Sequence, residues 1–241
     1  MSIVVIPRSG SSALLEHDDL FESLYNYGLT PLRFTVFDVI WCVGVHNFNA
    51  YDGVVATSKN GVWALWKSGC PKNKRFYVVG SGSLSFARSL GYTNCIQASQ
   101  SSAKTLALDV LHDFKLKTPA IFYMRGEKVA FNLEAFLSTQ KISLHTFVGY
   151  GLRKNKNSIS ALKDAMGKMP WGVVVLSREM ACLMTEVMPN DCLSKTRFFL
   201  LSSRLKDIFQ KKKCQNMYVA ALPEIKSLIT LLKLEKHKTF Q

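Results

Sequence analysis

The fold of this chain is decided by a stretch of fifteen residues, YDGVVATSKNGVWAL, which runs from Tyr51 to Leu65. A continuous apolar run ends in two hydroxyl residues, Thr57 and Ser58, and apolar residues at helical spacing follow it. This pattern predicts a buried strand, a tight turn and the start of a helix. Backbone N–H groups at a helix start stabilise anions, so the turn is also a candidate binding site.

The same pattern recurs in the second half of the chain. WGVVVLSREMACL aligns with DGVVATSKNGVWA so that Ser177 falls on Ser58, an offset of 119 residues (177 − 58). Three further pairs of segments align in the same order, with Arg197 on Arg75 (offset 122), Asn216 on Asn94 (offset 122) and Arg125 on Arg8 (offset 117). Four matches in order at nearly constant offset indicate an internal duplication, with repeats at about 1–117 and 118–241.

Each repeat is predicted to alternate strands and helices. Six apolar runs bounded by small polar residues are typical of strands buried on both faces: IVVIP, GVVAT, FYVVG, AIFYM, GVVVL and RFFLL. Five segments have apolar residues at helical spacing: 13–27, 83–90, 103–114, 134–140 and 224–234. Such alternation indicates an α/β fold with two similar domains, each a parallel sheet flanked by helices. Two extended segments, 31–38 and 144–152, fall outside the alternation and are predicted to be linkers.

The composition indicates a soluble protein, and its basic charge fits either an acidic partner or simply a well-solvated surface. The chain has 31 Lys and Arg against 17 Asp and Glu, a formal net charge of +14, and 48% hydrophobic residues, enough for a large core. Six scattered cysteines without a CxxC pair fit reduced thiols. The opening residues lack the pattern of a signal peptide, and no apolar run is long enough to span a bilayer, so a cytoplasmic location is expected.

The candidate site residues stand directly after the predicted strands, because ligands of open α/β sheets bind outside the carboxyl ends of strands. They are Arg8, Thr57, Ser58, Ser81, Ser83, Ser177, Ser202 and Ser203. Any single serine or threonine here could simply be a helix N-cap, which contributes about 1 kcal/mol to stability. Recurrence at equivalent strand ends of both repeats favours a shared ligand surface.

Several chemistries are excluded by the motifs. The chain has no GxSxG nucleophile elbow and no phosphate-binding P-loop, and its five histidines lack metal-ligand spacing. An enzyme here is expected to need no metal and no cofactor, and to work by orienting its substrate and stabilising developing charge. Tyr150, a polar aromatic residue in the second linker, is either such a site residue or a half-buried tyrosine of paired strands.

The order and spacing of these segments resemble the uroporphyrinogen-III synthase family over nearly the whole chain. The resemblance is carried by Pro7-Arg8 after the opening strand, YDGVVATSKNGVWAL, FYVVGSGSLSFARSLGY, IFYMRGEKVAFNLEAFL, FVGYG, GVVVLS and AALPEIKSLITLL. It implies two α/β domains joined by a two-stranded linker, with the ligand cleft between them. The implied domains are 1–34 with 150–241, and 37–147, with linkers near 31–38 and 144–152.

The resemblance also implies an activity. The family cyclises hydroxymethylbilane, a linear tetrapyrrole with eight carboxylates, with loss of water and inversion of ring D. This reaction, catalysed by a lyase of haem biosynthesis, gives uroporphyrinogen III and requires no cofactor. Tyr150 matches the tyrosine proposed to help the hydroxyl leave, and the strand-end residues match positions that line the cleft. The expected protein is a monomer that contacts the preceding pathway enzyme transiently and binds neither membrane nor nucleic acid.

Three departures from the family pattern are present. Arg204 stands at the position of a family threonine, Ser83-Leu84 replaces a common Thr-Ala, and Gly149 precedes Tyr150 where a bulkier residue is usual. An alternative therefore stays open, a non-catalytic bilobed protein that binds a polyanionic ligand or nucleic acid. The charge is −2 for 1–34, +6 for 35–146 and +10 for 147–241, so it is not gathered in one arm. If the family reading holds, Ser58 and Ser177 should face one another across the cleft.

Overall fold

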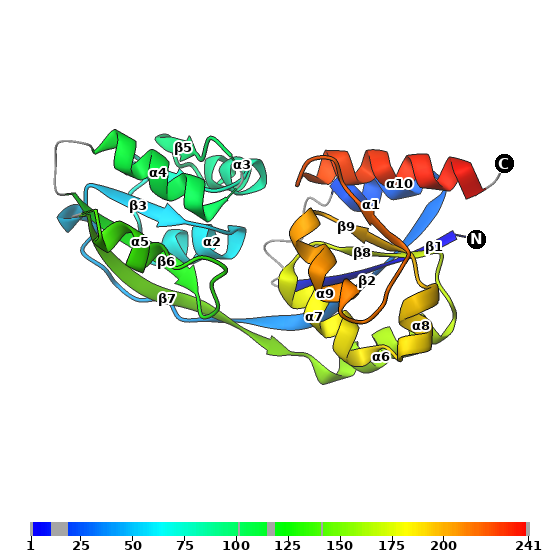
Figure 1. Ribbon diagram of the computed structural model, residues 1–241. Helices are drawn as coiled ribbons and strands as arrows, with labels where there is room; N and C mark the ends of the chain where they lie inside the picture. The colour runs from blue at the N-terminus through cyan, green and yellow to red at the C-terminus, as the bar shows by residue number, and fades with distance from the viewer. Residues whose placement is uncertain (1, 11–18, 101, 115–118, 141, 240–241) are drawn as a thin grey trace. The chain divides into compact units, whose positions relative to one another are not determined.

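The chain divides into two units, and two long strands belong partly to each. Figure 1 shows a computed structural model that describes residues 2–10, 19–100, 102–114, 119–140 and 142–239. Unit 1 is Met1–Asp38 with Arg153–Gln241, and unit 2 is Val39–Leu152. The chain passes between them in β2 (Leu29–Trp41) and β7 (Ser143–Lys154). The segments predicted to be linkers are therefore parts of continuous strands.

Unit 2 is a parallel sheet with a helix pair on each face. Its strands lie in the order β7-β6-β3-β4-β5, with β3 (Gly53–Ala56), β4 (Phe76–Val78), β5 (Cys95–Gln97) and β6 (Ala120–Gly126). One face packs on α2 (Lys59–Lys67) and α3 (Ser81–Ser89) through a core that includes Val54, Leu65 and Phe122. The other face packs on α4 (Ala103–Asp113) and α5 (Leu133–Ser138). A short 3-10 helix, η2 (Phe48–Ala50), precedes β3.

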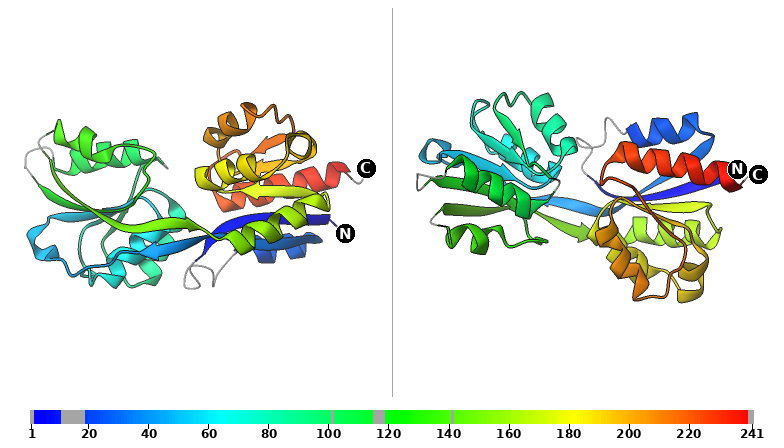
Figure 2. Two further views of the ribbon diagram at one scale, coloured as in Figure 1. Left: turned by 90° about the horizontal axis from the view of Figure 1, so that it is seen from below. Right: turned by 45° about the horizontal axis from the view of Figure 1, so that its top comes forward.

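Unit 1 repeats this design. Its strands lie in the order β10-β9-β8-β1-β2, with β1 (Ser2–Gly10), β8 (Gly172–Val175), β9 (Phe198–Leu200) and β10 (Met217–Val219). The helices α1 (Asp19–Asn26) and α10 (Ile225–Thr239) lie side by side on one face (Figure 2). The opposite face carries α6 (Lys156–Gly167), α7 (Arg178–Val187), α8 (Asn190–Lys195) and α9 (Lys206–Gln210), and η3 (Ser203–Leu205) precedes α9.

The pairing of the strands reflects the duplication. The first strand of each repeat joins the sheet of the other repeat: β1 pairs with β8, and β6 pairs with β3, all in parallel. Both first strands also shift register against the following strand at the same place, after Arg8 in β1 and after Arg125 in β6. The predicted α/β fold with parallel sheets flanked by helices is confirmed.

Some elements escaped the sequence prediction. The edge strands β5 and β10 are three residues long and only partly buried, which is too short for a clear apolar run. The polar sequence of α6, KNSISALKDAMG, hides its single apolar stripe around Leu162 and Met166. Of the helix predicted at 13–27, the structure describes the part from Asp19, and 11–18 lie outside the described residues. No helix among the described residues is long and apolar enough to cross a membrane.

Candidate functional site

The turn after β3 is a capped helix start, as its sequence predicts. All four residues of β3 are buried, and Ser58 follows in extended conformation as the N-cap of α2. Its Oγ accepts a hydrogen bond from the N–H of Gly61 at 3.1 Å. A Cβ atom at Gly61 would lie 2.9 Å from the carbonyl oxygen of Met124. Glycine is therefore required here because the first turn of α2 lies directly against β6.

Ser58 also contacts Tyr150, the tyrosine predicted from sequence. The Ser58 Oγ and the Tyr150 hydroxyl lie 2.8 Å apart, although 92 residues separate them in the chain. The register shift after Arg125 pairs Tyr150 with Gly126. A Cβ at Gly126 would lie 2.7 Å from Cζ of the tyrosine ring. The tyrosine ring therefore lies against Gly126, whose lack of a side chain lets the ring approach the sheet closely.

Gly149, one of the departures from the family pattern, has a structural reason. A Cβ atom at this position would collide with the Sδ of Met124 and lie 3.0 Å from the Cβ of Ala64. The backbone of β7 thus passes close to α2 immediately before Tyr150. The close approach brings the tyrosine hydroxyl within reach of the helix start.

The ring of Tyr150 contacts Trp41, which belongs to a larger group of aromatic side chains in unit 2. The ring of Trp41 lies 6.1 Å from that of Tyr150 and 6.4 Å from that of Trp63, which in turn contacts Trp66 and Phe86. Trp41 reaches this position because the Cys42 N–H donates to the Gly149 carbonyl at 2.9 Å, which holds the end of β2 beside β7. Sequence analysis singled out neither Trp41, which lies in no motif, nor Trp63, which lies within the stretch from Tyr51 to Leu65.

A second tyrosine, Tyr123 in β6, was also missed from sequence. The hydroxyl of Tyr123 in β6 lies 3.4 Å from Oγ1 of Thr57. Burial raises the pKa of Tyr123, and the hydrogen bond from Thr57 opposes part of that rise. Its hydroxyl therefore stays neutral and can serve as a hydrogen-bond partner. A buried tyrosine in a strand carries no sequence signal that separates it from ordinary core.

Arg125, at the end of β6, uses its side chain in contacts with neighbouring residues of the same unit. Its Nη1 donates to the carbonyls of Gly126 and Glu127 at 3.0 Å, and its Nε lies 2.9 Å from Oε1 of Glu134. Both side chains of the ion pair are partly buried, so solvent screens it less than a fully exposed pair. The carboxylate of Glu134 is thus held in an ion pair with Arg125.

The turn after β4 holds the remaining predicted residues of unit 2. Helix α3 begins at Ser81, which is exposed, and its N-cap Gly80 provides no side-chain hydrogen bond. Ser83, in the first turn, is only 9% exposed. A Cβ at Gly82 would lie 3.4 Å from Cε of Lys59, so this lysine side chain lies beside the start of α3. The N–H groups of a helix start and a lysine together favour a carboxylate at this end of the helix.

The predicted residues of unit 1 follow its three central strands. Ser177 caps α7, with its Oγ accepting from the N–H of Met180 at 3.4 Å. Ser202 and Ser203 follow β9, and Ser203 is exposed at the start of η3. Arg8 lies half-buried near the end of β1. Because β1, β8 and β9 are neighbours and parallel, these residues share one edge of the sheet.

The structure thus joins two of the predicted residues directly, Ser58 and Tyr150, and collects the others at the carboxyl edge of their own sheet. That Ser58 and Ser177 face one another stays a prediction. Among the described residues, no group of three or more His, Cys, Asp or Glu side chains could hold a metal ion.

Comparisons with known proteins give one consistent result. The family model described as uroporphyrinogen-III synthase HemD matches residues 24–230. The structure is similar to that of uroporphyrinogen-III synthetase from Helicobacter pylori 26695, with a TM-score of 0.65 and 13% identity over 100% of both chains. A mutant uroporphyrinogen III synthase from Thermus thermophilus has a TM-score of 0.58 and 14% identity, covering 98% of this chain and 100% of that one. None of the curated proteins compared with the chain matches it.

Proposed function

The chain belongs to the uroporphyrinogen-III synthase family, and we propose that it cyclises hydroxymethylbilane to uroporphyrinogen III. Membership of this family indicates an enzyme of haem biosynthesis. The proposed reaction is that of a lyase, since one molecule of water is lost as ring D is inverted and the macrocycle closes. The proposed enzyme is a cytoplasmic monomer that works without a cofactor and meets the preceding pathway enzyme transiently.

The proposal rests most directly on the contact between Tyr150 and Ser58, whose hydroxyl oxygens lie 2.8 Å apart. The first step of the reaction, departure of a hydroxyl group, needs a proton donor and leaves a delocalised cation on the substrate. A neutral phenol can supply that proton, and the phenolate that it becomes balances the charge of the cation. The neighbouring phenol, Tyr123, is kept neutral by burial, and Glu134 is paired with Arg125.

The binding of the substrate is proposed to use the remaining strand-end groups. Hydroxymethylbilane carries eight carboxylates, and the chain carries a formal charge of +14. Helix starts, serine and threonine hydroxyls and basic side chains stabilise carboxylates by charge-assisted hydrogen bonds. The proposed contacts are Thr57, Ser81 and Ser83 in unit 2, and Arg8, Ser177, Ser202 and Ser203 in unit 1.

The residues act in a simple order in this mechanism. Tyr150 gives its proton to the departing hydroxyl, so that the C–O bond breaks and water leaves. The resulting cation attacks the substituted position of ring D, and the spiro product fragments and recloses with ring D inverted. Loss of one proton from the closed ring restores Tyr150. The protein orients the chain and stabilises charge, the two effects that the composition of the site allows.

A coupled assay that separates the type III isomer from the spontaneous type I isomer tests the proposal. The purified protein should yield the type III isomer, and Tyr150→Phe should lower kcat by about 100-fold or more, the usual contribution of a general acid. Turnover unchanged in Tyr150→Phe would remove the tyrosine from this role. Absence of type III product, with strongly salt-dependent binding to nucleic acid, would favour the alternative of a binding protein, which no comparison supports.

A further inference from the structure

We propose that Ser58 is a positioning residue, which holds the hydroxyl of Tyr150 and connects it to the positive end of α2. Sequence analysis predicted Ser58 as a direct contact of the substrate, so the inference gives it a different role. It rests on the proposed function, because it assigns the serine a part in the proton transfer from Tyr150.

The hydrogen bonds of Ser58 leave its own hydrogen available for Tyr150. A serine hydroxyl has one hydrogen to donate and two lone pairs that accept. One lone pair of the Ser58 Oγ accepts from the Gly61 N–H at 3.1 Å, and the Tyr150 oxygen lies 2.8 Å away. If Ser58 donates its hydrogen to the phenolic oxygen, Tyr150 keeps its own hydrogen for the substrate. With this donor direction, which the proposal adopts, the serine orients the phenol O–H toward the leaving group.

The ring of Tyr150 is restrained by its neighbours, and this restricts the position of the Tyr150 hydroxyl. It lies over Gly126, where a Cβ would approach its hydroxyl oxygen to 2.8 Å, and Trp41 lies 6.1 Å from its centre. Sheet and indole therefore restrict the ring from two sides. The third restraint is the Ser58 hydroxyl, which contacts the reacting end of the side chain.

The same connection stabilises the tyrosine after it has reacted. When the Tyr150 O–H bond breaks, its proton goes to the departing hydroxyl and the electron pair stays on the phenolic oxygen. That oxygen then accepts from Ser58, which accepts from the N–H of Gly61 in the first turn of α2. Chains of hydrogen bonds polarise one another, and a helix start stabilises negative charge. Proton loss from the cyclised product returns the hydrogen to Tyr150.

The duplicated turn in unit 1 separates this role from capping. Ser177 caps α7 in the same way, with the same extended backbone. The residue that corresponds to Tyr150 by strand register is Phe37, which has no hydroxyl. An N-cap serine at this turn therefore does not require a tyrosine partner, and the Ser58–Tyr150 contact is an addition to the cap.

A double-mutant cycle tests the proposal in the synthase assay. Ser58→Ala should lower kcat roughly tenfold, the equivalent of one hydrogen bond, and change KM less than about twofold. Ser58→Thr should restore most of kcat. In the Tyr150→Phe background, Ser58→Ala should have no further effect, since interacting residues are non-additive. Effects that multiply would make Ser58 an independent substrate contact and overturn the proposal.

A matched control removes the effect of losing a helix cap. Ser102 caps α4 in unit 2, with its Oγ accepting from the Thr105 N–H at 3.0 Å, and lies outside the proposed site. Ser102→Ala should lower the Tm about as much as Ser58→Ala and leave kcat unchanged. If both variants lose kcat equally, Ser58 acts only as a cap and the proposal is wrong. Ser58→Gly, which keeps the helix start at a smaller cost in stability, replaces Ser58→Ala if that variant fails to fold.

A readout independent of activity separates this proposal from the proposed function. In protein labelled with ¹³Cζ-tyrosine, the resonance missing from Tyr150→Phe identifies Tyr150. Ser58→Ala should move this resonance, and Ser102→Ala should not. A shift in a protein without synthase activity would support the contact and refute the proposed function. An unmoved resonance would overturn the role of Ser58 whatever the activity.

Discussion

The turns at Ser58 in unit 2 and Ser177 in unit 1 have the same backbone and different chemistry. Each follows a four-residue buried strand, and their φ and ψ angles are −153° and 161° at Ser58, and −145° and 165° at Ser177. Each serine accepts from the N–H three residues later. Ser58 also contacts the hydroxyl of Tyr150, whose register equivalent in unit 1 is Phe37. The two turns share their backbone, and a tyrosine two strands away in β7, where unit 1 has a phenylalanine, gives the turn of unit 2 a second hydroxyl.

A further difference lies inside the two turns. The residue that donates to the cap is Gly61 in unit 2 and Met180, a buried side chain, in unit 1. Beneath Tyr150 stands Gly126, where unit 1 has Ser9 opposite Phe37. Around its tyrosine, unit 2 therefore has glycines with close backbone contacts at positions where unit 1 has side chains.

The largest effect is expected from Gly126→Ala, which breaks the feature that distinguishes unit 2. The added Cβ would lie 2.7 Å from Cζ of Tyr150, so the ring must move. We expect an activity loss of about 100-fold, as large as the loss of the general acid itself, together with about 1–3 kcal/mol lower stability from overpacking. The synthase assay and thermal unfolding measure both. Gly167→Ala is the control, because a Cβ there meets nothing within 4 Å; equal losses in both variants would contradict the expectation.

Gly61→Ala makes the turn of unit 2 more like that of unit 1. The new Cβ would lie 2.9 Å from the Met124 carbonyl oxygen and 3.1 Å from the Cβ of Ala56, so α2 must withdraw from β6. We expect about 1–3 kcal/mol lower free energy of unfolding and a smaller loss of kcat than in Gly126→Ala. Urea unfolding and the assay test this. An unchanged unfolding midpoint would show that α2 can move away from β6 without a loss of stability.

Phe37→Tyr makes the opposite change and gives unit 1 a tyrosine at the equivalent position. Phe37 is 7% exposed, so an added hydroxyl should lower the free energy of unfolding by about 1–3 kcal/mol. Combined with Tyr150→Phe, it should not restore synthase activity, because the register equivalent lacks the glycine and indole that hold Tyr150. Recovery of type III product in the double variant would show that the two turns are interchangeable.

The smallest effect concerns pH and again distinguishes the units. His46 packs among Phe48, Phe122 and Phe147 in unit 2, and burial, with a smaller contribution from His145, lowers its pKa below 6.5. The unfolded chain therefore binds a proton more readily than the folded one. Stability of unit 2 is complete above about pH 6.5 and should fall as the pH drops below that value toward the lower folded pKa.

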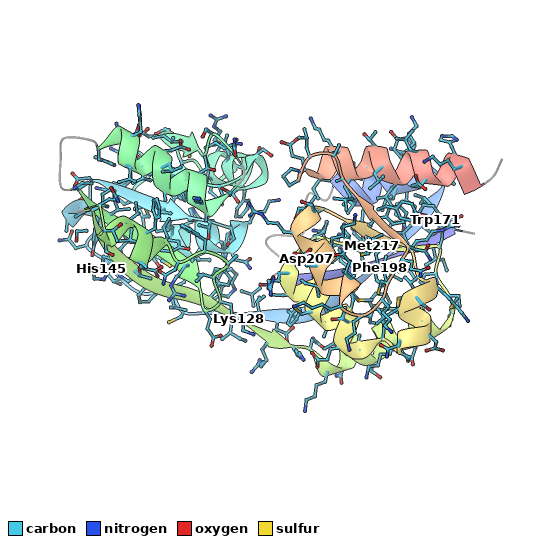
Figure 3. All side chains as sticks on the ribbon, in the orientation of Figure 1. Lys128, His145, Trp171, Phe198, Asp207 and Met217 are labelled. Atoms are coloured by element: carbon cyan, nitrogen blue, oxygen red, sulfur yellow. The ribbon has the colours of Figure 1, made fainter. Side chains whose placement is uncertain are left out.

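Tryptophan fluorescence can follow this change in unit 2. Three of the four tryptophans, Trp41, Trp63 and Trp66, lie in unit 2, so a Trp171→Phe variant reports on that unit alone. Urea unfolding at about pH 7.5 and about pH 5.5, on either side of the ordinary histidine pKa, should show the loss of stability, and His46→Leu should reduce it. His145, which contributes to the pKa shift of His46, lies at the opposite end of unit 2 from Lys128, two residues after the Gly126 that pairs with Tyr150 (Figure 3), so we expect kcat to be independent of this titration. If the pH dependence of stability is unaltered in His46→Leu, groups other than His46 cause it.

Much of the fold could be predicted because the signals are local. The runs GVVA and GVVV are buried on both faces, and the serine after each caps the next helix, as the strand–turn–helix pattern requires. The edge strands β5 and β10 gave no clear apolar run and the helix α6 was missed, because a short or largely polar element leaves a weak apolar pattern. Within the site, Tyr123 and Trp41 were missed for a related reason. The sequence pattern does not distinguish a tyrosine or tryptophan of a strand from an ordinary core residue.

The sequence by itself determined the duplication, the parallel α/β fold and the hydroxyl residues at the strand ends, since each depends on residues close together in the chain. Only the tertiary structure decided which of those hydroxyls meet. Ser58 and Tyr150 are 92 residues apart, and their contact depends on a register shift after Arg125 and on close passage of the backbone at Gly126 and Gly149. Strand register and backbone approach are set by the packing of whole elements, which no local pattern records.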